Sequence, residues 1–307
     1  MDAEEKIEQL KAVVKEDPTD FESVKELAFM LCNSGENETA YELYLYLLKY
    51  FPEDADIYYN MGIINEKNKD LDAAVKNYEK AASIEPEEID YRFNEACVYI
   101  NLKNYDKALS LLEKIVEDAP QDSDALFQLG MVYSRKNMSE KAVPLLEKAW
   151  VLNPEDSIAG FYLAYEYKRL GRIDDALAAY DKVTEISPDY SWAYFNKAVI
   201  YWEKNLEYEA IENLHMTLET NPHDIEAYKL FIKILLKTDN IDGAEAVVAK
   251  ALSQNPDNGD LLYAAAMTYK KKSDYAKYSD FIKKAYKNRE TLSLPEKVIT
   301  KLFKEVR

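Results

Sequence analysis

The residues best suited to metal or proton chemistry are few in this chain of 307 residues, which has only two histidines and two cysteines. On a helix, His215 has Glu212 and Glu219 at i−3 and i+4, an arrangement that can begin a metal site. One histidine between two glutamates is more typical of a solvated helix face, and His223 has no evident partner. We therefore expect no metal site.

Motifs for covalent catalysis or phosphate binding are also missing. The sequence contains no P-loop, no G-x-S-x-G and no H-E-x-x-H, and its 7 glycines are too few for glycine-rich phosphate loops. Two cysteines, Cys32 and Cys97, are too few for a disulfide scaffold. We predict that the chain is not an enzyme and needs no cofactor.

Three lysines form a candidate site for an anion. Lys229, Lys233 and Lys237 are spaced i, i+4 and i+8, so on a helix they share one face. Such a face suits an acidic tail or a terminal carboxylate of a partner. The alternative is a solvated surface that only increases the solubility of the chain.

Aromatic and amide residues recur at one fixed spacing. Five aromatic residues stand 34 residues apart, at Tyr59, Phe93, Phe127, Phe161 and Phe195. The following position carries Asn60, Asn94, Gln128, Tyr162 and Asn196. Aromatic rings are rigid apolar anchors for a partner, and carboxamides can pair with an extended peptide backbone. Trp192 and Trp202 flank Phe195 and strengthen this candidate surface.

The same 34-residue period organises the whole chain. Eight prolines are separated by seven consecutive gaps of 34 residues, at Pro18, Pro52, Pro86, Pro120, Pro154, Pro188, Pro222 and Pro256. Alanines keep the step from Ala40 to Ala244, and a second series of small residues includes Gly62 and Gly130. A fixed period of this length indicates a repeat architecture.

Each period contains two apolar runs at helical spacing, which predicts a pair of helices. In residues 123–156, Gly130 and Ala142 are small enough for the two helices to approach closely, Ser139 can cap the second helix, and Pro154 cannot continue it. Glu95 and Lys197 occupy usually apolar positions. We expect them to be partly exposed or ion-paired, with Arg92 as the candidate partner of Glu95.

These features resemble the tetratricopeptide repeat (TPR) family, for instance through Tyr58, Met61 and Gly62, followed by Ala74 and Tyr78. The resemblance covers nearly the whole chain and implies an all-α fold, a right-handed α-solenoid superhelix of 34-residue helix-turn-helix repeats. We expect a lone helix in 1–20, a closing helix in 293–307, and eight repeats at 21–54, 55–88, 89–122, 123–156, 157–190, 191–224, 225–258 and 259–292.

The resemblance also implies a concave groove, lined by the first helix of each repeat, in which ligands bind. The candidate groove residues are Tyr59, Asn60, Phe93, Asn94, Phe127, Gln128, Met131, Phe161, Tyr165, Trp192, Phe195, Asn196, Trp202, Lys229, Lys233 and Lys237. The row formed by Asn60, Asn94 and Asn196, with Gln128 in line, is similar to the asparagine ladder of O-linked N-acetylglucosamine transferases. The alternative is that the row is generic to the repeat and that the rings pack on neighbouring helices.

A second pattern known in the family does not fit. The dicarboxylate clamp of heat-shock cochaperones would match Lys25 and Asn60, but Phe29, Asp90 and Asn94 depart from it. Asp90 would repel a carboxylate. The resemblance therefore favours another kind of protein or peptide partner.

The charge distribution restricts the partner further. The formal net charge is −18, which disfavours nucleic acid and anionic membranes, yet residues 270–307 carry 12 basic and 5 acidic side chains. We expect a non-catalytic interaction scaffold whose acidic walls favour basic segments and whose lysines favour acidic ones. The alternatives are a scaffold that self-assembles into homo-oligomers through its basic end, and a peptide-sensing regulatory subunit.

The remaining expectations concern location. The first ten residues, MDAEEKIEQL, lack a basic segment followed by an apolar one, and no run of 18 apolar residues occurs. We expect a cytoplasmic chain that does not insert into a membrane.

Overall fold

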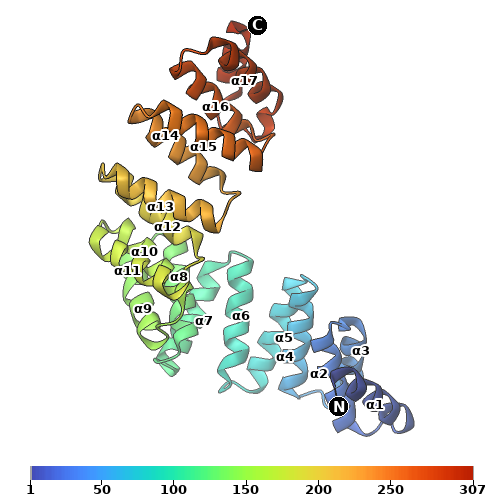
Figure 1. The fold of residues 1–307 in the computed structure, drawn as a ribbon. Coiled ribbons are helices and arrows are strands. Elements are labelled where there is room, and N and C mark those ends of the chain that lie inside the picture. The colour runs from blue at the N-terminus through green and yellow to red at the C-terminus, as the bar shows by residue number, and fades with distance from the viewer. Residues whose placement is uncertain (1, 307) are drawn as a thin grey trace. The chain divides into compact units, whose positions relative to one another are not determined.

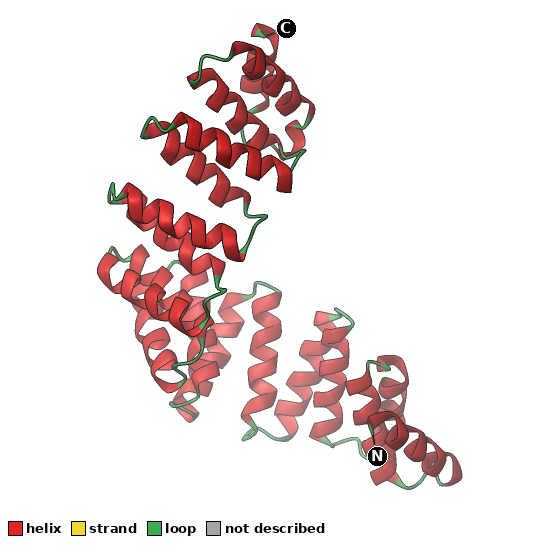
Figure 2. Ribbon diagram, in the orientation of Figure 1, coloured by secondary structure: helices red, strands yellow, loops and turns green. Residues whose placement is uncertain are grey.

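The computed structural model describes residues 2–306, and over this range it contains helices and no strands (Figure 2). The all-α fold predicted from the 34-residue period is confirmed. The chain divides into two compact units, Met1–Asn153 and Pro154–Arg307. No helix of the described residues is both long and apolar enough to cross a bilayer.

In the first unit, a lone helix precedes four helix pairs (Figure 1). Its helices are α1 (Ala3–Glu16), α2 (Phe21–Ser34), α3 (Asn37–Leu48), α4 (Ala55–Lys67), α5 (Leu71–Ile84), α6 (Ile89–Asn101), α7 (Tyr105–Asp118), α8 (Ser123–Arg135) and α9 (Ser139–Leu152). We call α2, α4, α6 and α8 the first helices and their partners the second helices.

The second unit has four further pairs and a closing segment. Its helices are α10 (Ser157–Arg169), α11 (Ile173–Ile186), α12 (Ser191–Glu203), α13 (Glu207–Thr220), α14 (Ile225–Lys237), α15 (Ile241–Gln254), α16 (Gly259–Lys271), α17 (Tyr275–Lys287), the short 3-10 helix η1 (Arg289–Thr291) and α18 (Glu296–Glu305). The first helices here are α10, α12, α14 and α16.

The turn inside each pair follows one backbone design. One or two residues after the end of each first helix, one residue has a positive φ, between 56° and 90°, and the eight positions are again 34 residues apart: Gly35, Lys69, Lys103, Asn137, Gly171, Asn205, Asp239 and Ser273. A left-handed residue reverses the chain directly after a helix. In the connections between pairs, most first helices begin with an Asp or Asn cap; for example, Asp54 Oδ1 accepts a hydrogen bond from Ile57 N.

Small residues bring the paired helices together as the sequence predicted. A Cβ atom on Gly62 would lie 2.5 Å from the ring of Tyr78, and one on Gly130 would lie 2.9 Å from Leu146. Tyr78 and Leu146 are fully buried. The alanine series is fully buried from Ala40 to Ala244, so these positions hold the framework of every repeat.

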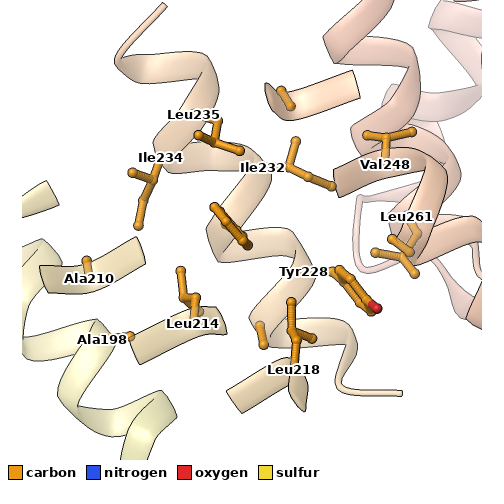
Figure 3. Close-up of a cluster of buried hydrophobic side chains, with 14 of the residues drawn as sticks. Ala198, Ala210, Leu214, Leu218, Tyr228, Ile232, Ile234, Leu235, Val248 and Leu261 are labelled. Atoms are coloured by element: carbon orange, nitrogen blue, oxygen red, sulfur yellow. The ribbon is translucent and has the colours of Figure 1, made fainter. Parts of the chain in front are cut away.

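A cluster of the second unit shows how consecutive pairs share a core (Figure 3). Leu214 and Leu218 of α13 pack with Tyr228 and Ile232 of α14, and Val248 of α15 joins them. Because each helix packs mainly on its neighbours along the chain, the core is continuous within the unit.

The C-terminal segment closes the second unit. Gly259 N donates a 2.7 Å hydrogen bond to Thr291 Oγ1, and Ser293 N donates one of 2.7 Å to Asp260 Oδ1. Ile299 of α18 is fully buried, and Phe303 stacks on Tyr286 with ring centroids 4.3 Å apart. The segment therefore caps the first turn of α16 and covers the apolar face of α17.

Two predictions about single residues are wrong. Glu95 is buried and does not pair with Arg92, whose Nη1 lies 2.9 Å from Asp118 Oδ2 on α7. Helix α9 is capped by Met138 without a side-chain hydrogen bond, while Ser139 is buried as its first residue. The prediction for Lys197 is confirmed, because its Nζ lies 2.6 Å from Asp181 Oδ1.

Candidate partner-binding surface

The candidate surface consists of the second, fifth, sixth and ninth positions of the first helices. These positions follow an i, i+3, i+4, i+7 pattern, so they share one face of each helix. We call this face the ligand face and describe it for each unit separately. All sixteen predicted site residues are half-buried or exposed, which leaves each of them some surface for a partner.

The asparagine side chains are held in one orientation. Asn60, Asn94 and Asn196 each donate from Nδ2 to the backbone oxygen four residues earlier, at 2.7, 3.0 and 2.8 Å. Asn94 donates its second amide hydrogen to Tyr59 Oη at 2.8 Å. The three Oδ1 atoms have no partner among the described residues. The row therefore offers acceptors, which suit the N–H groups of an extended peptide.

The aromatic row serves the framework as well as the surface. Tyr59 lies against Tyr91, with ring centroids 5.0 Å apart, and Phe161 lies 5.3 Å from Tyr190 and 5.7 Å from Tyr180. Burial raises the pKa of Tyr59. Phe195 packs against the core of the second unit. These rings match the alternative in which the row packs on neighbouring helices, and only their edges remain for a partner.

Two predicted aromatic residues are more open. The exposed fraction is 57% for Trp192 and 41% for Tyr165. Both lie on first helices of the second unit, and Trp192 is one turn from Asn196. A large exposed apolar side chain beside a fixed amide is typical of an interaction site. Phe93, Phe127, Gln128 and Met131 are half-buried.

The three lysines do not form one free cationic pocket. Lys229 Nζ lies 2.8 Å from Glu226 Oε1 and 2.9 Å from Asp260 Oδ2. Burial acts to lower the pKa of Lys229, but these hydrogen bonds outweigh it and the pKa is raised. Lys237 Nζ lies over the ring of Trp202, 4.3 Å from its centroid. Only Lys233 of the three is exposed without such a partner among the described residues.

The lysines at the end of α16 are paired as well. Lys271 Nζ lies 3.1 Å from Asp239 Oδ1, and Lys272 binds Asp242 and Glu245. Lys270 lies 5.4 Å from the ring centroid of Tyr278. These contacts within the chain compete with the head-to-tail contact that the self-assembly alternative requires.

Apart from Trp192, no residue at the second position of the ligand face was among the predicted site residues. In the first unit this position is acidic and exposed in every repeat, at Glu22, Asp56, Asp90 and Asp124. In the second unit it begins with Ile158 and Trp192, which are 50% and 57% exposed. The 34-residue period was sufficient to find this row, because it needs no knowledge of side-chain contacts.

A cavity of about 270 Å³ opens beside this row in the first unit. It lies between α2, α3 and α4 and is lined by Ile57 together with Lys25, Glu26, Phe29, Tyr44, Asp56 and Asn60. Phe29 is 52% exposed, whereas Tyr44 is fully buried and its hydroxyl has no hydrogen-bond partner. Of these residues, only Asn60 was among the predicted site residues.

Comparison with known families agrees with the repeat structure. Tetratricopeptide repeat models match residues 66–130 and 207–268, residues 32–88 and residues 164–205. A model of anaphase-promoting complex, cyclosome, subunit 3 matches residues 101–183. No curated protein sequence matches the chain.

Solved structures with the same fold include three informative ones. YrrB, described as a TPR protein with an unusual peptide-binding site, is 26% identical, with a TM-score of 0.53 over 60% of this chain and 95% of YrrB. MamA is 25% identical, with a TM-score of 0.51 over 53% of this chain and 95% of MamA. A chain of the APC/C hetero-tetramer Cut9-Hcn1 is similar to this chain in fold only. It is 16% identical, with a TM-score of 0.54 over 82% of this chain and 50% of that one.

Proposed function

Because the chain belongs to the tetratricopeptide repeat family, we propose that it is a non-catalytic scaffold for protein–protein interaction. The partner segment binds along the ligand face of the first helices. The observation that carries this proposal is the pairing of exposed Trp192 with Asn196, whose side chain is fixed by a 2.8 Å hydrogen bond to the backbone of Trp192.

The chemistry of this surface matches an extended peptide. The asparagine Oδ1 atoms accept hydrogen bonds from peptide N–H groups, while Trp192 and Tyr165 provide apolar contact area at a low cost in side-chain entropy. The peptide-binding site described for YrrB supports the same kind of ligand for this chain. Peptide binding then needs no chemical step, only contacts that neighbouring repeats present in series.

The test is selection of a random peptide library, displayed on phage, against the full chain. Affinities of the selected peptides are then compared for Trp192→Ala and for the matched control Tyr208→Ala, which removes a 77% exposed ring from a second helix. We expect Trp192→Ala to weaken binding about tenfold, or 1.4 kcal/mol, and Tyr208→Ala to leave it within about twofold. Equal losses in both variants, or no selected peptide at all, would contradict the proposal.

A further inference from the structure

We propose that the cavity between α2, α3 and α4 is a subsite for an arginine side chain of the bound peptide. This inference rests on the proposed function and adds the chemical identity of one partner residue. It follows from which groups of the cavity wall already have partners within the chain and which do not.

Two of the three charged residues that line the cavity are paired with an opposite charge. Lys25 Nζ contacts Asp54 Oδ2, and Lys6 Nζ lies 3.1 Å from Glu26 Oε1. Asp56 has no cationic partner among the described residues. Its Oδ1 accepts a 2.9 Å hydrogen bond from Tyr91 Oη, which leaves Oδ2 open. The uncompensated charge of the cavity wall is therefore negative and lies on Asp56.

The polar atoms without partners are all able to accept hydrogen bonds. They are Asp56 Oδ2, Asn60 Oδ1 and Tyr44 Oη. The orientation of Asn60 is fixed because its Nδ2 donates 2.7 Å to the backbone oxygen of Asp56. A guanidinium group carries five N–H donors, no acceptor and a positive charge. It therefore complements the two pure acceptors, Asp56 Oδ2 and Asn60 Oδ1, whereas a carboxylate, which can only accept, does not.

The remaining wall suits the rest of an arginine side chain. The exposed ring of Phe29 can stack on a guanidinium plane, and Ile57 and the ring of Tyr44 provide apolar surface for the methylene groups. The volume of about 270 Å³ lies just below the range of about 300–1,000 Å³ of small-molecule sites, which favours a single side chain. The exposed carboxylates of Glu22 and Asp90 on neighbouring positions increase the local attraction for a basic segment.

The experiment uses the isotope-labelled full chain and a heptapeptide, acetylated and amidated, whose only charged group is one central arginine. The matched peptide carries citrulline, which has the same shape without the charge. We expect the arginine peptide to shift the amide signals of Phe29, Ile57 and Asn60 and to bind at least fivefold more tightly than the citrulline peptide. Equal affinities, or shifts confined to other residues, would overturn the inference.

Two variants assign this preference to the cavity. Asp56→Asn removes the charge but keeps an acceptor for Tyr91, so the fold should be retained. In this variant the arginine and citrulline peptides should bind with about equal affinity. Asp124→Asn makes the same change at the same repeat position outside the cavity and should leave the preference unchanged. A preference that survives Asp56→Asn, or is lost equally in Asp124→Asn, overturns the assignment.

The two proposals fail separately. If peptides that depend on Trp192 bind but the arginine peptide shows no preference, the subsite is absent and the scaffold function stands. If the arginine peptide binds in the cavity but no peptide depends on Trp192, the subsite stands and the proposed site in the second unit is wrong. If neither binds, both proposals are wrong.

Discussion

The two units place different chemistry at the same repeat position. The second position of the first helices is acidic in all four repeats of residues 1–153, and it is Ile158 and Trp192 in the first two repeats of residues 154–307. The charge of the units follows the same division, with 32 acidic and 17 basic side chains in the first unit against 25 and 22 in the second. At this position one helical framework therefore carries acidic residues throughout the first unit, and two apolar residues followed by Glu226 and Asp260 in the second.

The framework itself is alike in both units. The seven alanines from Ala40 to Ala244 have no exposed surface, whichever unit they belong to. The positions that hold paired helices together are thus fixed by packing, while those of the ligand face are free to differ. The chemistry of the ligand face can therefore change from repeat to repeat without altering the fold.

The largest expected effect concerns the framework. Gly62→Ala places a methyl group within 2.5 Å of the Tyr78 ring, which is fully buried and cannot yield easily. We expect a loss of about 2–3 kcal/mol in the free energy of unfolding, measured with urea. Gly171→Ala is the control, because its Cβ meets nothing within 4 Å and only the φ of 75° opposes it. A greater loss for Gly171→Ala would show that turn strain, and not helix packing, limits stability.

A second difference lies at the seventh position of the first helices, where the first unit has Glu95 and the second has Lys197. Burial, followed by repulsion from Glu79, raises the pKa of Glu95 from 4.5 to about 7 despite the opposing attraction of Lys107. Between these pH values the folded chain holds a proton that the unfolded chain has released. The contribution of Glu95 to stability is therefore fully present below pH 4.5 and is lost as the pH rises to about 7.

Removing this charge should stabilise the first unit at alkaline pH. We expect Glu95→Gln to raise the free energy of unfolding by about 1–2 kcal/mol at pH 8 and to have little effect at pH 4. Lys197→Met should change stability by less than about 1 kcal/mol at either pH, because a partly buried ion pair is replaced by apolar packing. Urea unfolding at both pH values measures this, and a gain from Glu95→Gln that does not depend on pH would contradict the assignment.

The sequence was sufficient for the framework and insufficient for these polar partners. Gly62, Gly130 and the prolines act through backbone geometry, which the 34-residue period reveals directly. Arg92 was assigned to Glu95 on its own helix but pairs with Asp118 on the next one. Contacts between helices depend on the relative depth and rotation of both, and a one-dimensional pattern does not contain these.

The ligand face shows the same limit. The aromatic row was visible in the sequence, but the packing of Tyr59 on Tyr91 and of Phe161 on Tyr190 was not. The lysines were grouped correctly by helix face, yet Lys229 and Lys237 have partners on adjacent helices. The cavity around Asp56 needed three helices at once and could not be derived from the spacing within one.

A smaller effect is expected when the apolar residue at the second position is replaced by an acidic one. Trp192→Asp installs in the second unit the residue type that the first unit carries at this position. We expect peptides that depend on Trp192 to bind about tenfold more weakly, while stability changes by no more than about 0.5 kcal/mol because the side chain is 57% exposed. Titration calorimetry and thermal unfolding measure the two quantities. A large loss of stability would mean that Trp192 supports the fold.

The smallest expected effect is a difference between the two units in how peptide affinity depends on salt concentration. Binding of the arginine peptide to the first unit should weaken about twofold to threefold between 0.05 and 0.5 M salt, because the attraction to Asp56 and its acidic neighbours is partly exposed. Peptides bound at Trp192 should keep their affinity over the same range, since apolar contact is not screened. A similar salt dependence for both would remove the electrostatic distinction between the units.

The turn residue with positive φ has a consequence for engineering this chain. Six of the eight turns place a residue other than glycine in the left-handed region, for example Lys103 and Asp239. Asparagine and aspartate tolerate this region, whereas lysine and serine are strained in it, so replacing Lys69, Lys103 or Ser273 by glycine should raise the free energy of unfolding by about 0.5–1 kcal/mol. Substitutions in non-adjacent repeats should add up, because they share no contacts. The heat resistance of this chain can therefore be raised in small, countable steps without changing any residue of the ligand face.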